Sequence, residues 1–296
     1  LAALAGAAVI SWANASGAVS LPGLGDLRPW QLTLIVVGLP GLALVPLVLM
    51  LPEPARRRNT AEAAGEAPGF GEVLRYVGAR KRLFAGFVSV FCFMILIGYS
   101  TSWGAATFAR TWGWSAVEYA KAIGVTFLIV GPLTVNFAGW LSDRLYSRGR
   151  ADAPFLIPLA GVPIMLVGGA AWPLMPTGEL GLIVLGVTMA GSALASATGV
   201  TALLNIIPAA MRGQVIALYY MTISLFGIGF GPLSVGLLSD FVFGEAGLRY
   251  SMAVLPVIFG APVLLLSPWI LRDYRAALRS EGAARDLSPE SQAASP

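Results

Sequence analysis

The chain has 296 residues, of which 57% are apolar and only 11% are charged, and its mean hydropathy is +0.77. Water-soluble domains carry about 25% charged residues, so this composition excludes an ordinary soluble protein and indicates a membrane protein. The net charge of +4 is small and is accounted for below by loop topology, so it does not imply a nucleic-acid partner.

Uncharged runs near twenty residues recur along the chain, and each is long enough to cross about 30 Å of hydrocarbon as a helix. The chain begins with Leu1, and LAALAGAAVI lacks the basic start of a signal peptide. We therefore expect the C-terminal part of a longer protein, beginning inside a helix. The predicted segments are a partial span at 1–13 and full spans at 30–52, 83–108, 118–142, 154–175, 180–206, 212–238 and 249–271.

A segment rich in Pro, Gly, Ala and charge separates the second span from the third. Its first part, PEPARRRNTAEAAGEAPGF, has the composition of a flexible linker. In the following FGEVLRYVGARKRL, Phe70, Val73, Leu74 and Val77 recur at helical spacing, which favours a short helix on the membrane surface. A solvated basic linker is the alternative. The C-terminal residues 272–296 are poor in hydrophobic residues, so we expect a disordered tail.

Positive charges alternate between the loops. Fifteen of the nineteen Lys and Arg residues fall in the 53–82 loop, the loop after residue 142, the turn at Arg212 and the tail, whereas Arg28, Arg110, Lys121 and Arg249 fall in the opposite loops. Basic short loops stay on the cytoplasmic side. We therefore expect a multi-pass protein of the cytoplasmic (inner) membrane with a cytoplasmic C-terminus.

The segment GWLSDRLYSRGR places charges directly after an apolar run. Here Asp143 can pair with Arg144 or Arg148 and face the positive end of a neighbouring helix, while Gly139 allows that helix to approach. Such a contact can act as a latch that favours one conformation of a two-state protein. A loop that only sets topology is the alternative.

These features together resemble the major facilitator superfamily, with a long basic central loop followed by six spans. Gly139, Leu141, Asp143 and Arg144 match the repeated signature G-x-L-x-D-R-x-G-R-[KR] of that family, but Arg148, Gly149 and Arg150 come two places late. Which arginine serves as the second basic anchor therefore stays open. The resemblance implies an all-α integral membrane bundle with about seven and a half of twelve helices present.

The family's organisation divides the chain into four parts. Residues 1–52 would end the N-terminal bundle, 53–82 form the central cytoplasmic linker, 83–271 the C-terminal six-helix bundle and 272–296 the tail. Two segments, RPWQLTLIVVGLPGLALVPLVLMLPEP and MRGQVIALYYMTISLFGIGFGPLSVGLLSDFVFGEAGLRYS, are similar to the bacterial Spinster-like transporters, whose animal relatives move lysophospholipids and related lipids. The resemblance thus implies secondary active transport of a small organic, amphipathic or lipid-like solute by alternating access.

Within this resemblance, the first, second, fourth and fifth spans after the linker would face a central cavity. Ser192 and Ser196 share one helical face, as do Tyr220 and Ser224. Small-residue stripes also serve plain helix packing, which is the alternative for these faces. The candidate cavity residues are Phe91, Tyr99, Ser192, Ser196, Tyr220 and Ser224, and the candidate gating helix contains Gly227, Gly231 and Pro232.

The sequence contains no histidine, and no charged residue lies deep in any span from residue 83 onward. Proton relays need an ionisable group inside the membrane, so an acid that couples transport to protons or sodium is expected upstream of this chain. A membrane-embedded enzyme would need a buried acid, base or metal cluster, so no catalytic residue, metal or cofactor is expected. A channel or a scaffold remains the alternative. The expected partners are the solute and the membrane lipid, and we expect the full-length protein to be a monomer.

Overall fold

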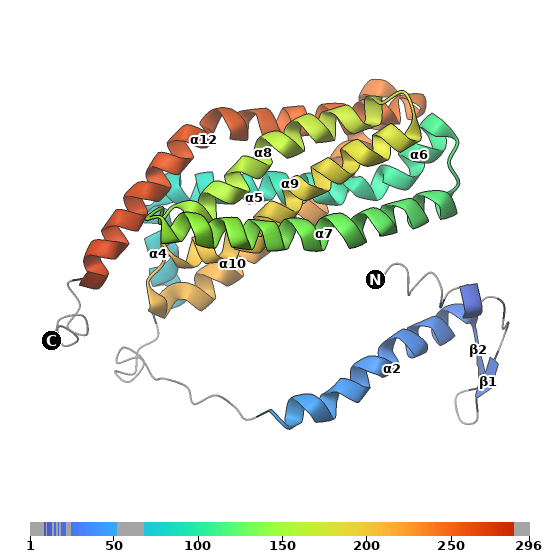
Figure 1. The fold of residues 1–296 in the computed structure, drawn as a ribbon, viewed down its shortest axis with the longest axis horizontal. Helices are drawn as coiled ribbons and strands as arrows, with labels where there is room; N and C mark the ends of the chain where they lie inside the picture. Colours follow the sequence, from blue (N-terminus) through green and yellow to red (C-terminus); the bar gives the residue numbers. More distant parts are fainter. Residues whose placement is uncertain are drawn as a thin grey trace. The chain divides into compact units, whose positions relative to one another are not determined.

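The computed structural model describes residues 9, 11–13, 15, 17, 19–21, 25–51 and 68–286, with side chains placed up to residue 281 (Figure 1). The chain divides into two compact units, Leu1–Thr60 and Ala61–Pro296. Each unit is described by itself. Most of the predicted partial span at 1–13, apart from the helical residues 9 and 11–13, and most of the predicted linker lie outside the described residues.

The first unit contains one long helix and a small hairpin. Strand β1 (Val19–Leu21) pairs antiparallel with β2 (Gly25–Leu27), a feature that the sequence did not predict. Helix α2 (Pro29–Leu49) follows and confirms the predicted span at 30–52. Its first turn is fixed by Pro29 and by the Arg28 backbone N–H, which donates to Oε1 of Gln31 at 2.9 Å.

The second unit is entirely helical in its described part. Its elements are α4 (Phe70–Ala79), α5 (Lys81–Ser100), η1 (Thr101–Trp103), α6 (Gly104–Trp112), α7 (Ala116–Ser147), α8 (Ala153–Ala171), η2 (Trp172–Leu174), α9 (Gly178–Leu204), η3 (Ala209–Met211), α10 (Arg212–Ser224), η4 (Leu225–Phe230), α11 (Gly231–Leu238), η5 (Ser239–Phe243), η6 (Glu245–Gly247) and α12 (Leu248–Asp286). Six continuous helical stretches in the described part of this unit are long and apolar enough to cross a membrane, and α2 of the first unit is a seventh. All seven full spans are therefore confirmed.

Small residues bring the helices of this unit close together. A Cβ atom at Gly161 of α8 would lie 2.6 Å from the carbonyl oxygen of Gly191 in α9, and one at Gly168 would lie 2.6 Å from Oγ1 of Thr188. Helices that pack in lipid gain mostly van der Waals contact, which such close approach maximises. Helices α7 and α12 lie on opposite sides of the unit in the view of Figure 1, with α8 and α9 between them.

The interior of the bundle is aromatic toward the end that carries α4. Phe87 of α5 stacks on Phe155 of α8 with ring centroids 5.0 Å apart, and Phe155 lies 4.5 Å from Tyr274 of α12. The Tyr274 hydroxyl donates to the carbonyl oxygen of Ala202 in α9 at 3.0 Å, so this polar group is satisfied inside the bundle. Four helices are joined through this cluster.

The structure tests two predictions about the flanking segments. The disordered tail predicted from residue 272 is wrong up to Asp286, because α12 continues to that residue. Burial of Tyr274 against the bundle and the ion pair of Arg275 with Asp152 hold this extension in place. The short helix after the linker is confirmed as α4. Val73 is fully buried, and the Tyr76 hydroxyl donates to the carbonyl oxygen of Ile206 at 3.0 Å, so part of its apolar face packs on the bundle.

Candidate functional site

A cavity of about 280 Å³ lies between α5, α7 and α9, with one residue from α8. Four hydroxyl side chains and no charged side chain line it, and the rest of the wall is apolar. The lining residues are Ile97, Gly98, Thr101, Phe127, Gly131, Val135, Met165, Leu185, Thr188, Met189, Ser192, Ala193 and Ser196. Such a wall suits a mostly apolar ligand with a few polar atoms.

The hydroxyl groups of the cavity have defined hydrogen-bonding roles. Thr188 donates to the carbonyl oxygen of Val184 at 3.0 Å, Ser196 to that of Ala193 at 3.0 Å, and Thr101 to that of Gly98 at 2.6 Å. Because each proton is used within its own helix, these oxygens face a ligand as acceptors. Ser192 has no such bond in the described part of the chain, so it can donate or accept.

The structure brings together two of the six candidate cavity residues. Ser192 and Ser196 line the cavity, whereas Tyr99, Tyr220 and Ser224 do not. Tyr99 and Tyr220 are about half exposed, and Ser224 is partly buried. Their cavity role remains a proposal.

Phe91 also lies outside the cavity and is buried in the bundle interior. Its ring is 4.9 Å from Phe87 and 5.5 Å from Tyr219, and a Cβ atom at Gly199 would meet it at 2.5 Å. Phe91 therefore packs the core of this unit.

Sequence reasoning missed the contribution of α7, namely Phe127, Gly131 and Val135. These apolar residues carry no local signal that distinguishes a cavity wall from a lipid-facing surface. Thr188 and Thr101 are among the polar residues that the sequence places on the cavity-facing spans, since Thr188 continues the serine face at a spacing of four residues and Thr101 ends the first span after the linker.

The candidate gating helix is irregular where the glycines and the proline occur. Leu225–Phe230 forms a π-helical segment between α10 and α11 and ends two residues before Pro232, whose ring removes a backbone donor. A Cβ atom at Gly231 would lie 2.8 Å from the carbonyl oxygen of Leu96, and one at Gly227 would overlap Ile95. Trp103 of η1 donates from Nε1 to the Pro232 carbonyl oxygen at 3.0 Å. The glycines thus permit contact with α5, and gating itself remains a proposal.

The candidate latch residues lie at the end of α7. Asp143, Arg144 and Arg148 are exposed, and in the described part of the chain Asp143 forms no ion pair or hydrogen bond with either arginine. The Arg144 guanidinium instead lies 5.4 Å from the Trp140 ring centroid. A Cβ atom at Gly139 would meet nothing within 4 Å. The internal pairing expected for Asp143 is therefore absent within this unit.

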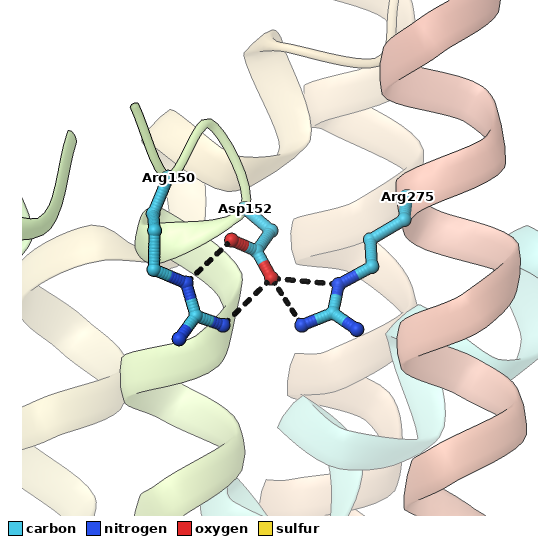
Figure 2. A network of polar contacts seen from close by, with 3 residues as sticks. All are labelled: Arg150, Asp152 and Arg275. Carbon is cyan, nitrogen blue, oxygen red and sulfur yellow. Dashed lines mark hydrogen bonds and ion pairs between the residues drawn. The ribbon is translucent and has the colours of Figure 1, made fainter. Parts of the chain in front are cut away.

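A different acid forms the polar cluster at this end (Figure 2). Asp152 precedes α8, and its carboxylate lies 2.7 Å from the guanidinium of Arg275 on α12 and 3.3 Å from that of Arg150. Burial by itself would raise the pKa of Asp152, but hydrogen bonds from Arg150 and Arg275 and their positive charges hold it below its ordinary value. The cluster ties the start of α8 to the end of α12.

Metal binding finds no support in the part of the chain that the structure describes. No group of three His, Cys, Asp or Glu side chains there could hold an ion.

Comparison with known proteins identifies the family. The sequence profile of the Major Facilitator Superfamily matches residues 2–232. No curated protein shows significant sequence similarity to the chain.

Two crystal structures of a bacterial homologue of the human lysosomal transporter Spinster resemble the chain. The inward-facing, unoccupied form has a TM-score of 0.56 and 23% identity over 94% of this chain and 61% of that one. The inward-facing, occupied form has a TM-score of 0.52 and 22% identity over 96% and 61%. At this identity the likeness concerns the fold, and the chain spans about three fifths of the length of those proteins. With seven helices in its described part that are long and apolar enough to cross a membrane, and a profile match over most of its length, the chain belongs to the major facilitator superfamily.

Proposed function

We propose that the chain is the C-terminal part of a secondary active transporter, which moves a small amphipathic organic solute by alternating access. The observation that carries the proposal is the cavity among α5, α7 and α9. It offers hydroxyl oxygens and an apolar wall without a charged side chain, which suits a solute with an apolar body and few polar atoms. The match to the Major Facilitator Superfamily supports a transport function.

The energy source and the direction of transport lie beyond this part of the molecule. In the described spans the charged side chains stay at the helix ends, so we propose that an acid coupling transport to protons or sodium lies in the other helical bundle. Accumulation of solute against a gradient in proteoliposomes distinguishes a coupled transporter from a channel or scaffold, which cannot perform it.

The cavity is tested by filling it. Ser192→Leu and Ser196→Leu each replace a lining hydroxyl with an apolar side chain, and we expect the apparent KM for an accumulated amphipathic solute to rise about tenfold, equivalent to about 1.4 kcal/mol. The matched control is Val187→Leu on the same helix, because Val187 is 51% exposed and lies outside the cavity lining. An equal rise for Val187→Leu, or no rise for either serine variant, would contradict the cavity assignment.

Orientation is tested by cysteine labelling in a Cys92→Ser background. We expect Ser147→Cys to react only from the cytoplasmic side and Glu179→Cys only from the outside, as the charge distribution between loops predicts. Glu179 is exposed, whereas a side chain at the neighbouring Gly178 would collide with Trp114. Labelling of both positions from one side would overturn the topology.

A further inference from the structure

We propose that a basic groove between the first turn of α5 and the C-terminal extension of α12 binds the phosphate of an anionic phospholipid headgroup. The groove has a volume of about 530 Å³, which is large enough for such a headgroup. It is lined by Ala79, Arg80, Lys81, Arg82, Leu83, Asp273, Ala276, Ala277 and Ser280. It lies away from the solute cavity and shares no residue with it.

The charged side chains of the groove differ in whether they have a partner of opposite charge. The Arg80 guanidinium lies 4.1 Å from the Tyr76 ring centroid and 3.8 Å from the Glu281 carboxylate, so it is fixed in place. Lys81 and Arg82 are exposed and form no ion pair in the part of the chain that the structure describes. The acid of the groove, Asp273, already lies 3.7 Å from Arg272. The groove therefore presents two uncompensated cations.

The backbone adds to this positive potential. Lys81 and Arg82 begin α5, a 20-residue helix, and the side chain of its N-cap Arg80 forms no capping hydrogen bond. The N-terminal end of a helix carries a partial positive charge and free N–H groups, which stabilise an anion. The alanines at 276 and 277 leave room above this end.

The depth of the groove in the membrane favours a lipid over a free anion. The apolar run of α5 starts at Leu83, and that of α12 ends at Leu271, so both walls pass from hydrocarbon to water at the level of the groove. Phospholipid phosphates lie at this level, and anionic lipids are enriched in the cytoplasmic leaflet. The inference thus rests on the proposed orientation, which the labelling experiment tests independently.

Native mass spectrometry of the purified full chain in mild detergent tests the site. The protein is titrated with phosphatidylglycerol, with phosphatidylcholine and, separately, with inorganic phosphate. We expect selective retention of phosphatidylglycerol. Lys81→Gln/Arg82→Gln should weaken it about thirtyfold, since each basic residue near a membrane surface contributes about 1 kcal/mol.

Two further variants separate the groove from general charge attraction. Arg75→Gln/Arg279→Gln removes two exposed positive charges from α4 and α12, outside the groove lining, and should retain the lipid as the wild type does. Ala276→Phe fills the groove without changing charge and should lose the lipid. The Ala276→Phe variant also tests the site on its own if the melting temperature of the Lys81/Arg82 variant shows that this variant does not fold.

Three results would overturn the proposal. These are equal weakening by both double variants, retention of phosphatidylglycerol by Ala276→Phe, and binding of inorganic phosphate as tightly as the lipid. The first would indicate nonspecific attraction to positive charge, and the third would indicate a phosphate site that does not recognise lipid.

Discussion

The first two spans after α2 in the described chain differ in how much of each is buried within the second unit. The stretches Lys81–Trp112 (α5 to α6) and Ala116–Ser147 (α7) both contain 32 residues and are both apolar enough to cross a membrane. In the most apolar part of the first, 56% of residues are buried within the protein, against 11% in the second. Apolar composition thus selects a helix for the membrane but does not decide how much of that helix packs against the other helices of the unit.

The difference arises from the residues that meet each helix. Neighbouring helices contact α5 through aromatic rings and through glycines such as Gly231, whose Cα closely approaches the α5 backbone. By contrast, α7 exposes Leu133, Phe137 and Trp140, and a Cβ atom at Gly139 would meet no other helix within 4 Å. Whether a glycine or a phenylalanine in an apolar run packs against another helix therefore depends on the residues of the helix that faces it.

The largest expected effect tests burial directly. Phe87→Ala on α5 should lower the free energy of unfolding by about 2 to 3 kcal/mol, because the ring is fully buried among other aromatic rings. Lipid reduces the transfer contribution, so the loss should fall below that in water-soluble cores. Leu133→Ala on α7, 67% exposed, should change it by less than about 0.5 kcal/mol. Reversible unfolding in mixed micelles measures both, and equal losses would refute the comparison.

The next effect compares two acids on either side of the turn between α7 and α8. Asp152→Asn should destabilise the bundle by about 2 kcal/mol, since it removes a charge that accepts hydrogen bonds from Arg150 and Arg275. Asp143→Asn on α7 should leave stability within about 0.5 kcal/mol but slow transport if the proposed latch contacts the other bundle. Melting temperature and initial transport rate separate the two roles. Unchanged transport for Asp143→Asn would leave the motif a topology signal.

The same acid gives a pH dependence of known sign. Because the folded protein holds the pKa of Asp152 below its ordinary value of about 3.9, its contribution is present above that pH. It should be lost as the pH falls through the lower, folded-state pKa. Asp152→Asn should therefore lose less stability than the wild type on acidification below about pH 4, and parallel losses would argue against the ion pairs.

The smallest effect compares two glycines. Gly231→Ala places a methyl group 2.8 Å from the carbonyl oxygen of Leu96 in α5, so the helices must separate, and we expect a loss of about 1 kcal/mol. Gly139→Ala on α7 meets open space and should raise stability by up to about 1 kcal/mol, because alanine favours the helix. Denaturation midpoints of the two variants should therefore shift in opposite directions. A shift in the same direction would contradict the packing difference.

Sequence reasoning located every full span because crossing hydrocarbon demands a long apolar run whose limits are set locally. It misjudged the end of α12, since Tyr274 and Arg275 look like part of a polar tail until Ala202 and Asp152 are placed beside them. Of the site, it found Ser192 and Ser196 from their shared face. It also proposed Phe91, which the fold buries in the interior.

The sequence by itself determined that this chain is a set of membrane helices with positively charged loops on one side, because the cost of placing charges and unpaired backbone groups in lipid acts on each segment separately. Only the tertiary structure decided which acid is paired. Asp143 and Asp152 stand nine residues apart beside arginines, yet Asp152 meets Arg275, 123 residues further along, while Asp143 remains exposed. Such pairings depend on how helices distant in sequence pack, and local composition carries no record of that geometry.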